Sequence, residues 1–80
     1  MAALQHIDAR SPKAIGAVVR LRRKAQQLTQ VQLGELALVG PRFIGELEAG
    51  KASLQLGKVL AVLEILGVRV SLSLSDRADA

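Results

Sequence analysis

The sequence contains no cysteine, no tryptophan and no tyrosine, and its single aromatic side chain is Phe43. Without cysteine the chain has neither a disulfide framework nor a thiolate metal site, which suits a reducing compartment. With one aromatic residue, the core must be built from leucine, valine, isoleucine and alanine. Long apolar runs are also absent: residues 59–68 are interrupted by Glu64 and span about half the length that a membrane helix needs.

Groups that carry catalysis are scarce as well. The chain has one histidine, His6, and its sequence shows no nucleophile–base set and no cluster of metal ligands. These absences predict a non-enzyme without a cofactor or a metal. The first ten residues, MAALQHIDAR, place His6 and Asp8 where a signal peptide keeps its apolar run. We therefore expect a cytoplasmic protein with no membrane partner.

Positive charge is the first feature that the sequence does have. Eighty residues form one small domain, near the size at which dimerisation often supplies missing burial. The formal net charge is +4, and four cations lie in the run RLRRK, residues 20–24. Such a cluster is typical of proteins that bind an anionic partner, nucleic acid first. A solvated helix face explains the run alone equally well.

Helix signals begin at Ser11 and Pro12. Serine can cap free amides, and proline fits the first turn because it has no N–H to satisfy. Apolar residues then follow at helical spacing to about residue 26, which leaves the cations mostly on the outward face. Thr29 is the next cap, and Gln32 completes a capping box for a second helix that ends near residue 37.

Two further helices follow a break at residues 38–40. The third begins at Pro41 and ends at Gly50, where a left-handed residue is favoured. The fourth covers about 57–66 and is apolar around most of its circumference. We therefore predict a mostly α fold of four to five short helices, with an N-terminal arm over 1–11 and a helical domain over 12–67.

Beyond Gly67 the segment VRVSLSLS, residues 68–75, alternates apolar and polar side chains as a β-strand does. A lone strand has no sheet, so we expect antiparallel pairing with a second copy across a two-fold axis. Pairing with the arm at residues 4–7 is the alternative. Residues 76–80 are expected to be a flexible tail. The expected dimer interface is Val62, Leu66, Val68, Val70, Leu72 and Leu74.

Residues 28–51 have the layout of a helix-turn-helix, in which two short helices pack across a three-residue turn and the second helix enters the major groove. Gly34 is small where the two helices approach each other. Apolar residues occupy the positions where the motif needs contacts between its helices and the core. These are Leu33, Ala37, Val39, Ile44 and Leu47.

This stretch resembles the Xre/Cro-type helix-turn-helix family, whose domain is lambda-repressor-like and whose motif runs LTQxxLAxxAGVxxxxIxxxExGK. Together the Ser-Pro start, RLRRKAQQLTQ, GPRFIGELEAGK followed by LGKVLAVLEILGV, and the short C-terminal strand are similar to HipB-type antitoxins. The chain departs from the family motif at Leu38, where glycine is usual in a left-handed turn, and at Gly34, where alanine is usual. It matches the motif at Leu28, Thr29, Gln30, Leu33, Ala37, Val39, Ile44, Glu48, Gly50 and Lys51.

The resemblance implies a homodimeric repressor that binds double-stranded DNA at a palindromic operator. It further implies an antitoxin that autoregulates a toxin–antitoxin operon, neutralises a HipA-like serine/threonine kinase toxin and is associated with the nucleoid through DNA. A stand-alone repressor without a toxin is one alternative. A protein-interaction module that has lost base reading is another, because Pro41 and Gly45 leave little side chain toward the groove.

Outward residues near the N-terminus of the third helix are expected to reach base edges. Arg42 can make a bidentate contact to guanine. Glu46 can accept a hydrogen bond from cytosine N4 or form an i,i+4 ion pair with Arg42. Phe43 can contact a thymine methyl or pack against the fourth helix. The predicted base-reading set is Pro41, Arg42, Phe43, Gly45 and Glu46.

The start of the second helix, at Thr29 and Gln30, resembles the phosphate clamp of the family. Lys51 follows the third helix and is a second candidate, while cations of the first helix add non-specific attraction. Glu48 is expected to bond to the first helix, with Arg22 as the suggested partner. The predicted phosphate contacts are Thr29, Gln30, Lys51, Arg20, Arg23 and Lys24.

Overall fold

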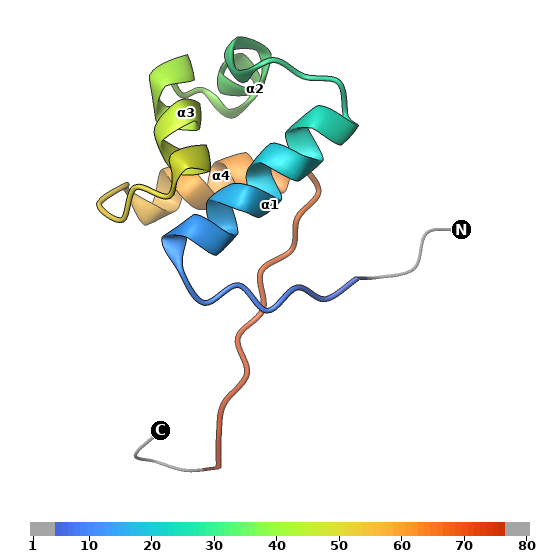
Figure 1. Ribbon diagram of the computed structural model, residues 1–80, viewed down its shortest axis with the longest axis vertical. Helices are drawn as coiled ribbons and strands as arrows, with labels where there is room; N and C mark the ends of the chain where they lie inside the picture. Colours follow the sequence, from blue (N-terminus) through green and yellow to red (C-terminus); the bar gives the residue numbers. More distant parts are fainter. Residues whose placement is uncertain (1–4, 77–80) are drawn as a thin grey trace.

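The computed structural model describes residues 5–76, which form four α-helices joined by short turns (Figure 1). The observed boundaries differ from the expected ones by one residue at most, so the predicted mostly α fold is confirmed. None of these helices is long and apolar enough to cross a membrane. The helices are α1 (Pro12–Ala25), α2 (Gln30–Ala37), α3 (Pro41–Ala49) and α4 (Leu56–Ile65).

The predicted helix caps form. Ser11 Oγ accepts a hydrogen bond from the Ala14 amide at 3.0 Å, so it caps α1. Thr29 Oγ1 accepts from the Gln32 amide at 3.0 Å, and Gln32 Oε1 accepts from the Thr29 amide at 2.9 Å, which completes the capping box of α2. Gly50 ends α3 in the left-handed region at φ 87°.

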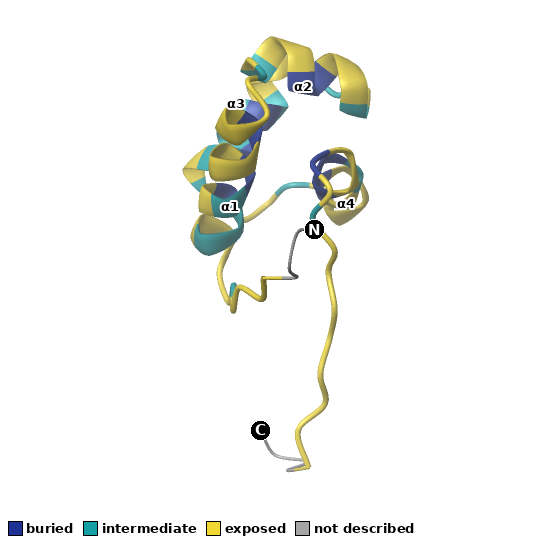
Figure 2. Cartoon of the chain, turned by 90° about the vertical axis from the view of Figure 1, so that its right-hand side faces the viewer, coloured by how far each residue is buried: buried dark blue, intermediate teal, exposed yellow. Residues whose placement is uncertain are grey.

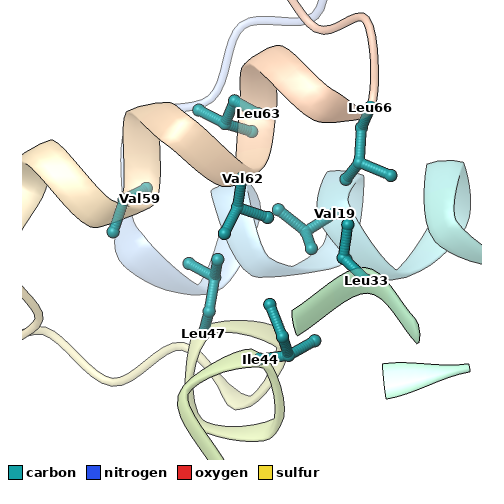
Figure 3. Packing of buried hydrophobic residues seen from close by; sticks show 8 residues of the cluster. All are labelled: Val19, Leu33, Ile44, Leu47, Val59, Val62, Leu63 and Leu66. Atoms are coloured by element: carbon teal, nitrogen blue, oxygen red, sulfur yellow. The ribbon is translucent and has the colours of Figure 1, made fainter. Parts of the chain in front are cut away.

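The hydrophobic core lies where all four helices converge. The buried faces of α1, α2 and α3 turn toward α4 (Figure 2). As the composition requires, the core is aliphatic, and Phe43 lies at its edge with only part of its surface buried. Figure 3 shows the eight buried side chains: Val19, Leu33, Ile44, Leu47, Val59, Val62, Leu63 and Leu66.

Helices α1 and α3 approach so closely that only glycine fits at one position. A Cβ atom on Gly16 would collide with the carbonyl oxygens of Leu47 and Glu48. Gly16 is therefore required by packing, although glycine lowers the helix propensity of α1. No local motif in the sequence predicts this contact.

The C-terminal end of α4 is hydrogen-bonded to the last turn of α1 through the Leu66 carbonyl group. Arg22 donates to the Leu66 oxygen from Nε at 3.2 Å and from Nη2 at 2.9 Å, and Gln26 Nε2 donates to it at 2.9 Å. A cation at a helix C-terminus also interacts favourably with the helix dipole. These bonds fix the point at which the chain leaves the helical domain.

The predicted strand is not formed. Within residues 5–76 there is no β-strand, and residues 68–75 extend away from the helices (Figure 1). A strand needs a neighbour to bond with, and within the described residues no second strand pairs with this segment. The alternative ladder with the arm is not formed by the described part of the arm either, and Leu4 lies outside the described residues. Of the predicted tail 76–80, only Asp76 is described.

Two residues of the predicted dimer interface belong to the core of the single chain. Val62 and Leu66 are fully buried among the other helices, so their assignment to an intermolecular surface is wrong. With Val59 and Leu63 they form the inward face of α4 and of the turn that ends it. The large apolar side chains that α4 leaves exposed are instead Leu56, Leu60 and Ile65.

Candidate nucleic-acid interface

The turn between α2 and α3 sets the geometry of the interface. Leu38 adopts the left-handed conformation (φ 59°, ψ 40°) that the resemblance predicted for this position. The Val39 amide then donates to the Gly34 carbonyl at 2.8 Å. A Cβ atom on Gly34 would lie 2.6 Å from the Val39 oxygen, too close for any real contact. Both departures from the family motif therefore belong to one tight turn.

A buried ion pair joins α1 to α3 behind the interface. Arg23 Nε donates to Glu48 Oε2 at 2.6 Å and Arg23 Nη2 donates to Glu48 Oε1 at 3.1 Å, with side-chain exposures of 10% and 4%. Arg23 Nη1 also donates to the Leu28 oxygen at 2.8 Å. Glu48 therefore does bond to the first helix, but its partner is Arg23 and not Arg22.

The pKa of Glu48 reflects this environment. Burial raises the pKa of the carboxyl group. Hydrogen bonds from Arg23 and Gln30 lower the pKa and together outweigh burial, so the pKa lies below its ordinary value. The hydrogen bond to Glu48 correspondingly raises the pKa of Arg23, although burial opposes it. Both groups are therefore charged at neutral pH.

Arg23 was predicted to contact a phosphate. Its side chain is buried, so it is not available to DNA and the prediction is wrong. The cause lies in its position on α1, because Gly16, Val19 and Arg23 are spaced i, i+3, i+7 and share the inward face. This spacing was the signal in the sequence that could have revealed it. The neighbouring cations Arg20 and Lys24 are exposed, as expected.

Gln30 connects α2 to the outward side of α3. Its Nε2 donates to Glu48 Oε1 at 3.3 Å, so the buried ion pair also orients this amide. The other end of the amide faces α3, since a Cβ atom on Gly45 would lie 3.6 Å from Gln30 Oε1. Thr29 is occupied by the capping box. The start of α2 is thus a pre-ordered set of polar groups next to α3.

The predicted base-reading residues lie at the first two turns of α3. Pro41 is exposed, and the Arg42 side chain is 90% exposed. Phe43 packs partly against the core. Glu46 forms the i,i+4 ion pair, with Oε2 at 3.7 Å from Arg42 Nε. The same oxygen lies 3.0 Å from Lys51 Nζ.

The arrangement is suited to binding an anionic polymer and not to catalysis. Exposed cations lie at the start of α3, just after α3 and along α1, and the N-terminal end of the α2 dipole adds partial positive charge. Within residues 5–76, no group of three or more histidine, cysteine, aspartate or glutamate side chains could hold a metal ion.

The fold and this placement of side chains define a DNA-binding helix-turn-helix protein and not an enzyme. The chain belongs to the Helix-turn-helix family, whose profile matches residues 19–72. It is 51% identical over 63 residues to the "Uncharacterized HTH-type transcriptional regulator y4mF" of Sinorhizobium fredii (strain NBRC 101917 / NGR234). That match covers 79% of this chain and 83% of the relative.

Solved structures share the fold. A HipB-O4 20mer complex superposes with a TM-score of 0.75 at 20% identity, covering 91% of this chain and all of that one. A protein described as "MDT Protein" gives the same TM-score, identity and coverage. At this identity the likeness concerns the fold. The expected Xre-type family and HipB-like architecture are both confirmed.

Proposed function

We propose that this protein is a sequence-specific repressor that reads its operator through the N-terminal half of α3. The observation that carries the proposal is the 90% exposed side chain of Arg42, held at the start of the second helix of a helix-turn-helix. An arginine there can donate two hydrogen bonds to guanine in the major groove. Pro41, Gly45 and the exposed part of Phe43 let the backbone of α3 come close to the bases.

Contacts with phosphates position α3 in this proposal. The free amides at the start of α2 bind one phosphate, and Gln30, oriented by Glu48, contributes its amide group. Lys51 binds a second phosphate from beyond the end of α3. Arg20 and Lys24 add charge that is not sequence-dependent. Thr29 contributes mainly by fixing the start of α2.

A homodimer is the second part of the proposal. Val70, Leu72 and Leu74 expose 57%, 94% and 96% of their surface on one side of an extended segment that forms no β-ladder within the described residues. Pairing with the same segment of a second copy would supply a ladder partner, and Leu60 and Ile65 of α4 would extend the interface. Two copies of α3 would then read half-sites about 34–36 Å apart.

The biological role that we propose is that of an antitoxin. Its support is the resemblance to HipB-type proteins in the helix-turn-helix and its flanks, together with the HipB-like fold. In this role the protein represses its own operon in the cytoplasm, where it is bound to the nucleoid, and neutralises a HipA-like kinase. A stand-alone repressor would have no kinase gene next to its own. If a neighbouring kinase gene is present, co-purification of its product with this protein tests the antitoxin role.

Footprinting on the DNA upstream of its own gene tests the repressor function. The wild type is compared at two salt concentrations with Arg42→Ala and with Lys58→Ala, which removes an exposed cation from α4. We expect a protected palindrome that weakens with salt, is lost in Arg42→Ala and is kept in Lys58→Ala. Protection that survives Arg42→Ala would refute base reading through α3 and leave the protein-interaction module.

A further inference from the structure

The acidic residue on the outward side of α3 has contacts that the repressor function described so far does not use. Glu46 Oε2 lies 3.0 Å from Lys51 Nζ and 3.7 Å from Arg42 Nε. One carboxylate oxygen therefore faces two cations that are assigned to DNA. The Glu46 side chain is 29% exposed, less than Arg42 at 90% and Lys51 at 47%, so the acid is the more fixed member of each pair.

The Arg42 atom that faces Glu46 determines whether Arg42 can contact a base while the ion pair is present. That atom is Nε, so the ion pair does not require the two terminal nitrogens of the guanidinium, which are the atoms that can donate to guanine O6 and N7. The ion pair is therefore compatible with base reading. A contact between Arg42 and a phosphate is different, because it draws the guanidinium off the helix and brings a second anion toward the carboxylate.

We propose that Glu46 is a positioning residue that holds Arg42 in the orientation for guanine and opposes contacts of Arg42 with phosphates alone. The proposal rests on the proposed function. The ion pair is kept when Arg42 reads a base and lost when Arg42 moves to a phosphate. Glu46 therefore weakens non-specific binding more than specific binding, and it sets the ratio between the two affinities.

The test measures affinities by fluorescence anisotropy across a range of salt, on the footprinted operator and on a random duplex of equal length. Glu46→Gln is expected to bind the random duplex about two- to fivefold more tightly than wild type, as expected for the loss of one exposed ion pair. The operator affinity stays near wild type, so the specificity ratio falls by the same factor. Salt dependence on the random duplex becomes steeper. In an Arg42→Ala background, Glu46→Gln leaves the ratio unchanged.

The matched control is Glu35→Gln, which removes the same charge from an exposed position on α2. An equal gain in Glu35→Gln would assign the effect to net charge and overturn the proposal. So would a loss of operator affinity in Glu46→Gln confined to one base pair, since that pattern belongs to an acceptor for cytosine N4.

The same experiment separates this inference from the function beneath it. Suppose wild type distinguishes the duplexes through Arg42 while Glu46→Gln matches wild type on both: then only the positioning role of Glu46 fails. Wild type that distinguishes no duplex at any salt concentration would remove base reading through α3 and the inference together.

Discussion

Leu38 combines a left-handed backbone with a side chain that is 90% exposed. A residue other than glycine in this conformation costs about 1 kcal/mol or more of stability. Because the leucine side chain is exposed, its burial offsets little of that cost. Leu38→Gly should therefore increase the free energy of unfolding by about 1 kcal/mol, as measured by urea denaturation. Leu36→Gly, at an exposed helical position, is the control and should decrease it by about 1 kcal/mol.

Gly16 and Gly57 are both helical glycines in very different surroundings. A Cβ atom on Gly16 would collide with the backbone of α3, whereas one on Gly57 would meet nothing within 4 Å. Gly16→Ala should therefore lower the free energy of unfolding by about 1–3 kcal/mol. Gly57→Ala should raise it by up to about 1 kcal/mol, because alanine is the better helix former. Equal effects of the two substitutions in thermal denaturation would contradict the close approach of α1 and α3.

Glu48 makes the stability of the protein depend on pH. Its pKa in the folded protein lies below the ordinary value of 4.5, so the unfolded chain binds the proton more readily. The stabilisation is therefore complete above about pH 4.5 and is lost as the pH falls through the lower pKa of the folded state. Denaturation curves of the wild type should show this loss, and those of Glu48→Gln should lack this contribution.

The neutral variant also tests the ion pair directly. Glu48→Gln leaves the buried Arg23 without an opposite charge and should cost about 3 kcal/mol at neutral pH. Glu35→Gln, at an exposed position, should stay within about 0.5 kcal/mol of wild type. A Glu48→Gln protein as stable as wild type at pH 7 would refute the stabilising role of the pair.

At the scale of elements, the helices were predictable because their signals are local. Caps such as Thr29 and terminators such as Gly50 act through neighbouring residues, so the boundaries of the four helices follow from short stretches of sequence. The pairing of Arg23 with Glu48 and the need for Gly16 arise from contacts between α1 and α3, which lie far apart in the chain. Of the site, the exposure of Arg42 was predictable, whereas the second cation on Glu46 depends on how α3 ends.

The extended segment 68–75 carries the prediction for assembly. Leu72→Lys together with Leu74→Lys should abolish the proposed dimer, because charge on the apolar side cannot be buried between strands. Ser71→Lys together with Ser73→Lys adds the same charge to the other side of the segment and should leave the dimer intact. Sedimentation velocity distinguishes the two pairs. A dimer that persists in the leucine variants would show that the segment is not the main contact.

The described part of the chain exposes many large apolar side chains for a protein of this size. Eight buried side chains make the core, while eleven large apolar residues remain exposed on the described part of the chain. A dimer that covers part of this surface links folding to association. The midpoint of thermal unfolding should therefore rise with protein concentration for wild type, as measured by circular dichroism. It should be independent of concentration for the Leu72→Lys, Leu74→Lys protein.

The bonds of Arg22 and Gln26 to the Leu66 carbonyl have a consequence for the choice of operator. They fix the direction in which the C-terminal segment leaves the helical domain, and in the proposed dimer that direction sets the angle between the two subunits. The angle in turn fixes the distance between the two copies of α3. A side chain remote from the bases would thus select the number of base pairs separating two half-sites, so Arg22 and Arg42 would divide the recognition of spacing and of sequence between them.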